Sequence, residues 1–123
     1  MEKDKLTEKV IGCAIEVHRS LGPGLLESTY EHCLAHELYI NNIFFKKQLP
    51  MPVIYKGINL DCGYRLDLVI ENTVIIELKS VKKMTAVDEA QILTYMRLAK
   101  IKTGLLINFN VSRLIDGVKR FKI

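Results

Sequence analysis

Three charged side chains in the middle of the chain are spaced so that they could work together. Glu77 and Lys79 are two residues apart, so on a β-strand both would point to the same face. Asp67 precedes Glu77 by ten residues, and Glu71-Asn72 between them favours a tight reversal of the chain. An antiparallel hairpin with this turn would bring Asp67 opposite Ile76 and Glu77. Two carboxylates and one ammonium group could then converge.

This group of charges has two interpretations. Mg²⁺ prefers oxygen ligands, usually one or two carboxylates with water and substrate phosphate, and Asp67 and Glu77 could supply the carboxylates. The alternative is a cross-strand salt bridge on an exposed sheet face. Val69 and residues 74–76 make both strands apolar, as in a sheet covered on both faces. Burying a charged side chain within such a strand has a large desolvation cost unless the charge is compensated, which favours the metal site.

Hydrophobic periodicity predicts the elements that would position these residues. Apolar residues recur at three- and four-residue steps over 6–21, which is typical of an amphipathic helix, and Gly22-Pro23-Gly24 would end it. A second helix is expected over about 26–40, and a third from a Thr85 cap to about Lys100. Strands are expected over 43–47, 52–55, 58–60, 64–70, 74–78, 104–109 and 118–123. This order predicts an α/β fold with a central mixed sheet flanked by helices.

Length and composition limit the class of protein. The 123 residues, of which 49% are hydrophobic, fit a single domain spanning 1–123. The first nine residues are too charged for a signal peptide, and no stretch approaches the roughly 18 apolar residues of a membrane span. Cys13, Cys33 and Cys62 are odd in number and widely spaced, which favours reduced structural thiols. We therefore expect a cytoplasmic protein with no membrane segment.

Charge is distributed unevenly along the chain. The formal net charge is +4, but residues 97–123 carry a net +6 and residues 1–96 a net −2. A basic segment on a mildly acidic body attracts polyanions through counterion release, which makes nucleic acid a reasonable partner. A solvated, lysine-rich surface would explain the same charges. Charge alone does not separate these interpretations.

Two motifs resemble a known family. Asp67, nine further residues and Glu77-Leu-Lys79, followed by Gln91-Ile-Leu-Thr-Tyr95, resemble the PD-(D/E)XK nuclease superfamily, in the branch with a Gln-x-x-x-Tyr helix after the active-site hairpin. Gly24-Leu-Leu-Glu27-Ser-Thr-Tyr30 is similar to the signature of the GxxExxY protein family. The leading Pro-Asp pair of the superfamily is Leu66-Asp67 here, which leaves the carboxylate in place. The resemblance implies a restriction-endonuclease-like core.

The resemblance also implies catalytic roles. The residues that would bind Mg²⁺ or Mn²⁺ are Glu27, Asp67 and Glu77. Lys79 would orient or help deprotonate the attacking water and offset charge at phosphorus. Gln91 and Tyr95, one helical turn apart, would face the site or the phosphate, although Tyr95 could equally be a core aromatic. Glu27 could instead be a helix N-terminal carboxylate favoured by the macrodipole.

Histidines and a second tyrosine are weaker candidates. His18 could lie at the rim of the same cleft, with Tyr30 nearby, but a helix histidine is more often at the surface or in a satisfied core. His32 and His36 are four residues apart, a spacing that can chelate a transition metal, yet no third ligand accompanies them. We expect both at the surface.

These observations together predict a metal-dependent nuclease that cuts DNA, or RNA, by attack of activated water on phosphorus. DNA is favoured over RNA, and a homodimer would suit so small a domain. The alternative is a nucleic-acid-binding or regulatory protein that keeps the nuclease fold without turnover. The residues expected to hold phosphates are Lys82, Lys83, Lys119, Arg120 and Lys122.

Overall fold

Two helices open the chain, as the periodicity predicts. The computed structural model describes residues 4–123. Helix α1 (Lys5–Leu21) begins at Asp4, whose side chain accepts hydrogen bonds from the backbone N–H groups of Leu6 and Thr7. It ends at Gly22, where φ is 72°, a value that favours glycine. Helix α2 (Glu27–Ile40) follows after a short loop.

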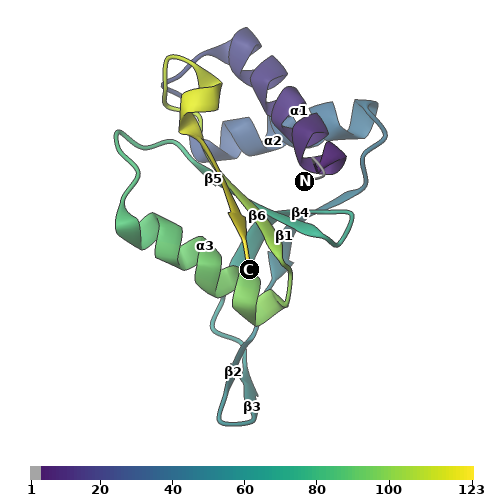
Figure 1. Cartoon of the computed structure of the whole chain (residues 1–123), viewed down its shortest axis with the longest axis vertical. Coiled ribbons are helices and arrows are strands. Elements are labelled where there is room, and N and C mark those ends of the chain that lie inside the picture. The colour runs from purple at the N-terminus through teal and green to yellow at the C-terminus, as the bar shows by residue number, and fades with distance from the viewer. Residues whose placement is uncertain (1–3) are drawn as a thin grey trace.

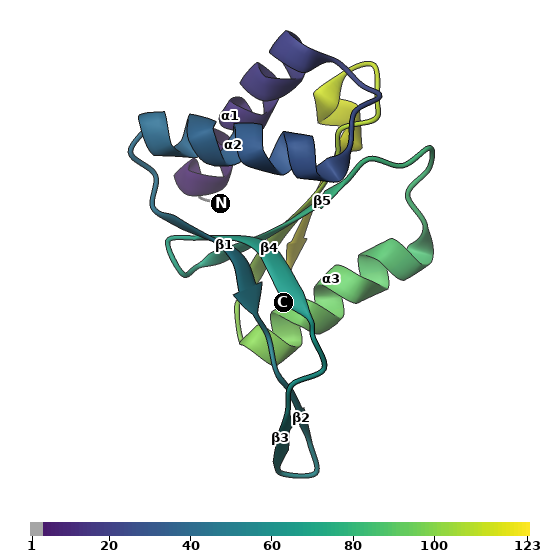
Figure 2. The same cartoon turned by 180° about the vertical axis from the view of Figure 1, so that it is seen from behind.

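Within residues 4–123, seven strands form a five-stranded sheet and a separate hairpin. The sheet has the order β1-β4-β5-β6-β7, with β5 and β6 parallel and every other neighbouring pair antiparallel. Its strands are β1 (Phe45–Pro50), β4 (Arg65–Ile70), β5 (Val74–Lys79), β6 (Thr103–Asn108) and β7 (Val118–Lys122). Strands β2 (Val53–Tyr55) and β3 (Ile58–Leu60) form a hairpin that projects from the sheet (Figures 1 and 2). The predicted mixed sheet is confirmed.

Helix α3 (Ala86–Ala99) makes the crossover between the parallel strands β5 and β6. It starts with a capping box, in which Thr85 accepts from the backbone of Asp88 and the Asp88 side chain accepts from the backbone of Thr85. It lies on the sheet face opposite α1 and α2 (Figures 1 and 2). Gly104 on β6 allows this close packing, because a Cβ there would lie 2.7 Å from Met96 Sδ.

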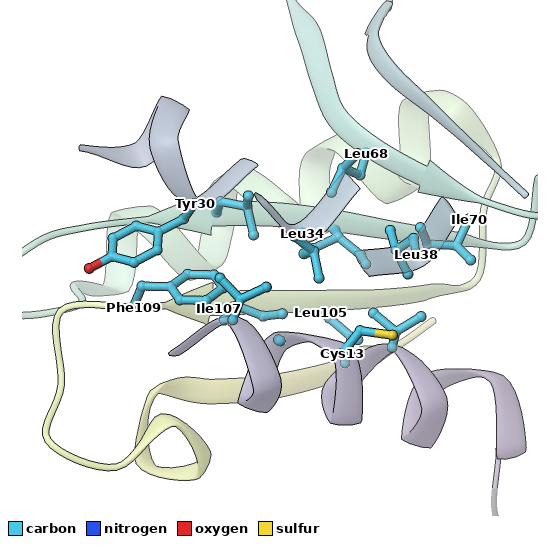
Figure 3. Close-up of a cluster of buried hydrophobic side chains, with 14 of the residues drawn as sticks. Cys13, Tyr30, Leu34, Leu38, Leu68, Ile70, Leu105, Ile107 and Phe109 are labelled. Carbon is cyan, nitrogen blue, oxygen red and sulfur yellow. The ribbon is translucent and has the colours of Figure 1, made fainter. Parts of the chain in front are cut away.

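The sheet separates two apolar clusters. The larger one lies between the sheet and helices α1 and α2, and Figure 3 shows Leu34, Leu38 and Phe109 within it. The smaller one lies between the sheet and α3, and includes Ile75 and Met96. Both central strands are therefore covered on both faces, as their apolar sequences predict.

Some details differ from the sequence prediction. The strand expected at 43–47 begins at Phe45, because Ile43 is buried in the larger cluster and its N–H donates to the Leu38 carbonyl. A 3₁₀ turn, η1 (Leu114–Gly117), precedes β7 and was not anticipated. All three cysteines are free, as expected. No helix within residues 4–123 is long and apolar enough to cross a membrane. The protein is one small α/β domain.

Candidate functional site

The β4–β5 hairpin places Asp67 and Glu77 side by side. Its turn has positive φ at Glu71 (49°) and Asn72 (58°), as predicted for a tight reversal. The strand ladder pairs Leu68 with Ile76 and stops there. Asp67 and Glu77 are the next two residues on the facing strands, so Asp67 lies opposite Glu77 rather than between Ile76 and Glu77, because the turn also includes Thr73.

Each carboxylate accepts a hydrogen bond from the backbone of the opposite strand where the ladder stops. The N–H of Asp67 donates to Glu77 Oε2 at 3.1 Å, and the N–H of Leu78 donates to Asp67 Oδ2 at 2.8 Å. The two side chains thus take the place of ladder carbonyls. Each bond gives a partner to a backbone N–H that the ladder leaves unpaired, and it fixes one oxygen of each side chain.

Gln48 on β1 contacts Asp67 from the other side. It has positive φ (50°), and its amide nitrogen lies 2.7 Å from Glu31 Oε1 and 3.4 Å from Asp67 Oδ1. The pleat of β4 also changes here, because Leu66 packs with the cluster under α3 whereas Leu68 packs with the other cluster. Gln48 was not among the predicted site residues. A single polar residue in a strand gives no sequence signal for such a contact.

Burial makes the carboxylate pair electrostatically unusual. Glu77 is 6% exposed, and its pKa is raised from 4.5 to about 8, first by burial and then by the charge of Asp67. Burial also raises the pKa of Asp67, against the N–H of Leu78, Gln48 and Lys79, which lower it. Burial thus disfavours the charged form of both carboxyl groups, and Lys79 offsets only part of this effect.

Glu27, the first residue of α2, is the third carboxylate near this pair. Partial burial raises its pKa, and the charges of Asp67 and Glu31 raise it further. Lys79 and the N–H of Ser80 oppose this shift. Glu27 is itself exposed, at the margin of the site.

Tyr30 fixes the loop that leads into Glu27. Its hydroxyl donates to the Gly22 carbonyl at 2.6 Å and accepts from the N–H of Leu25 at 3.1 Å. Its ring stacks on Phe109, with 4.4 Å between centroids. Tyr30 is therefore a buried residue that positions the start of α2.

Lys79 extends towards α3. Its Nζ lies 3.4 Å from Gln91 Oε1 and 3.9 Å from Asp88 Oδ1. Tyr95 is 8% exposed, and its pKa is raised by burial and then by the charge of Glu77, with a hydrogen bond from Gln91 opposing. The helix thus places Gln91 against Lys79 and Tyr95 near Glu77, while Tyr95 also belongs to the core. Asp88 was expected only as an early helix acid, and its contact with Lys79 is new.

The family comparison agrees with this geometry. A family model described as the PD-(D/E)XK nuclease superfamily matches residues 4–121. The chain belongs to this superfamily. Comparisons with curated proteins and with solved structures give no match.

PD-(D/E)XK nucleases usually use divalent metal ions, and the donor chemistry here suits one. Asp67 and Glu77 offer only oxygen atoms, which hard cations prefer, and burial raises the pKa of both groups because it disfavours their charged forms. In residues 4–123, however, no three His, Cys, Asp or Glu side chains are grouped closely enough to hold an ion. The use of Glu27 as a third ligand stays a prediction.

The basic residues of β7 do not share one surface. We name Lys119, Arg120 and Lys122 the β7 cations. Lys119 lies 2.9 Å from Glu89 on α3, whereas Lys122 lies 3.8 Å from Asp4 at the start of α1. Adjacent strand residues point to opposite faces, so Arg120 does not share the face of Lys119.

The loop between β5 and α3 carries the other two predicted phosphate ligands, Lys82 and Lys83, both exposed. Asn108, at the end of β6, anchors this loop: it is 3% exposed, accepts from the N–H of Val81 and donates to the Val81 carbonyl. These two hydrogen bonds therefore fix the position of the loop where it leaves β5.

The three histidines lie where the structural interpretation places them, in the core or at the surface. His18 is 8% exposed, and its Nε2 lies 2.8 Å from the Val111 carbonyl, so it is a satisfied core residue. His32 and His36 are exposed on α2.

Proposed function

We propose that this protein is a metal-dependent nuclease that hydrolyses phosphodiester bonds, and that it belongs to the GxxExxY family within the superfamily. The observation that carries the proposal is the hydrogen-bonded Asp67–Glu77 pair, with Lys79 on the same strand as Glu77. A structural salt bridge would pair these carboxylates with a cation, whereas Lys79 Nζ lies against Gln91 and Asp88 on α3.

Asp67 and Glu77, with Glu27, would hold Mg²⁺ or Mn²⁺. The bound ion would supply stabilisation of phosphate charge and a lower pKa for the attacking water. The two backbone N–H groups at Asp67 and Leu78 fix one oxygen of each carboxylate. The described residues donate no hydrogen bond to the other Glu77 oxygen, Oε1, which leaves it available as a ligand.

Lys79 would orient the attacking water and offset negative charge that develops at phosphorus. Its ammonium group is already directed by Gln91 and Asp88, so little motion would be lost on substrate binding. Tyr95 and Gln91 would complete the wall on the α3 side. Each of these groups acts on the phosphate or on the water beside it.

The test is cleavage of DNA and RNA oligonucleotides, single-stranded and duplex, with Mg²⁺, Mn²⁺ or EDTA. We expect metal-dependent cleavage by the wild type and a large loss of single-turnover rate in Lys79→Ala, with binding largely kept. Lys9→Ala, at an exposed lysine on α1, is the matched control and should cleave normally. Cleavage that persists in EDTA, or in Lys79→Ala, would contradict the proposal.

A second candidate is a nucleic-acid-binding or regulatory protein that keeps the fold without turnover. The observation that favours it is the lack of a closed three-ligand group in the described part of the chain. It predicts salt-dependent binding of oligonucleotides with no cleavage under any metal condition. The same oligonucleotide panel separates the two candidates.

We further propose that the substrate is DNA rather than RNA, that the protein acts in the cytoplasm and that it works as a homodimer. Three free cysteines suit a reducing compartment. A second copy would enlarge the surface that one small domain offers to a substrate. Relative cleavage rates of matched DNA and RNA strands, cell fractionation and sedimentation test these three points.

A further inference from the structure

A pocket of about 390 Å³ lies between α3 and the base of the β2–β3 hairpin. This α3 pocket is lined by Val53 and Tyr64 on one side and by α3 residues, including Val87, Gln91 and Tyr95, on the other. Most of its lining is apolar, and its volume lies within the range of small-molecule sites, about 300 to 1,000 Å³. Figure 2 shows the β2–β3 hairpin projecting past α3.

The α3 pocket shares two of its lining residues with the candidate active site. Gln91 lines the pocket and also accepts a hydrogen bond from Lys79. Tyr95 lines it too, and lies close enough to Glu77 for that carboxylate to raise its pKa. A phosphate beside Lys79 would therefore lie next to the pocket, within reach of a neighbouring nucleotide's base.

The aromatic residues of the pocket suit a flat ring. Tyr64 and Tyr95 pack edge to face, with 5.9 Å between centroids and 61° between planes. Tyr64 is 44% exposed, although large aromatic side chains are usually covered. Nucleobases stack on exposed tyrosine rings, and Gln91 and Thr94 add an amide and a hydroxyl group that can meet the polar edge of a base.

We propose that the α3 pocket receives the base of the nucleotide next to the scissile phosphate. The proposal rests on the nuclease function above and specifies its substrate. A base paired in a duplex cannot reach the pocket without leaving the helix, which has an energetic cost. The preferred substrate is therefore single-stranded or carries an unpaired nucleotide at the cleavage point.

The test couples a protein variant to a missing base. Single-stranded oligonucleotides with one abasic residue, moved stepwise past the cleavage point, are bound to wild type and to Tyr64→Ala. At one position the abasic residue should weaken wild-type binding about tenfold, and Tyr64→Ala should weaken binding of the intact strand by a similar factor. Together the two changes should weaken binding no further than either alone. DNA and RNA series show which sugar is accepted.

Two variants control this experiment. Tyr39→Ala, at an exposed tyrosine on α2 outside the pocket, should bind as wild type. Ala90→Phe, at an exposed α3 position on the pocket wall, should fill the pocket and reproduce the Tyr64→Ala defect. Thermal melting of each variant reports whether the fold is kept.

The outcomes separate the pocket from the chemistry. If the wild type cleaves, but Tyr64→Ala and the abasic residue have independent, additive effects on binding, base binding in the pocket is refuted and the nuclease function is not. Equal cleavage of duplex and single strand would refute base binding in the pocket as well. Coupled effects without cleavage would support base binding while refuting the nuclease function. Neither cleavage nor coupling would refute both.

Discussion

Replacing Glu77 by glutamine should make the protein more stable at alkaline pH. The native pKa of Glu77 is raised to about 8, whereas an unfolded chain would have an ordinary value near 4.5. Between these values the native state holds a proton that the unfolded state has released. Stability therefore falls as pH rises through this window, because the unfolded state binds fewer protons. Glutamine has no proton to lose, and its amide oxygen can still accept from the N–H of Asp67.

The size of the effect follows from the pKa difference. One pKa unit corresponds to about 1.4 kcal/mol, so the shift of Glu77 sets an upper limit of about 5 kcal/mol. Water entry and local relaxation reduce the penalty of a buried charge, so we expect about 2 to 3 kcal/mol at pH 9. Below pH 5 the wild type and Glu77→Gln should be about equally stable.

Urea unfolding between pH 4 and 9, in EDTA and in Mg²⁺, measures this difference. A bound cation would replace the proton, so Mg²⁺ should restore the stability of wild type at pH 9 and affect Glu77→Gln less. Glu71→Gln, an exposed position in the same hairpin, is the control and should follow the wild-type curve. Parallel curves for wild type and Glu77→Gln at all pH values would refute the argument.

The remaining predictions concern packing, loop position and charge. Gly117→Ala should lower the melting temperature and reduce the free energy of unfolding by about 1 to 3 kcal/mol, because the new Cβ would collide with the Asn108 carbonyl. An unchanged melting temperature would contradict this prediction. Tyr30→Phe removes the two hydrogen bonds that hold the loop before Glu27. It should lower the free energy of unfolding in urea by about 1 kcal/mol and weaken Mg²⁺ binding in calorimetric titration. Unchanged Mg²⁺ affinity would show that the Tyr30 hydroxyl does not position Glu27 for metal binding. Replacing all three β7 cations by alanine should reduce the slope of log affinity for nucleic acid against log salt concentration by about one unit per lost phosphate contact. An unchanged slope would show that these residues do not contact phosphates.

The sequence alone was sufficient for the features that depend on local rules. Helix and strand periods, the Thr85 cap and the turn at Glu71-Asn72 are set by residues close together in the chain. The turn fixed the hairpin register, and the register brought Asp67 to Glu77. The spacing of Glu77 and Lys79 then placed both on one face. The core of the candidate site was thus predictable.

Only the tertiary structure decided how these residues are held and how strongly they are perturbed. Gln48 reaches Asp67 from another strand, and Asp88 reaches Lys79 from a helix that lies beyond the hairpin. The positive β7 segment is one run in the sequence, yet its side chains divide between two faces of the sheet. The raised pKa of Glu77 comes from burial between layers, to which segments distant in the chain contribute. Such contacts and burial depend on packing between separate elements, and no local pattern in the sequence encodes them.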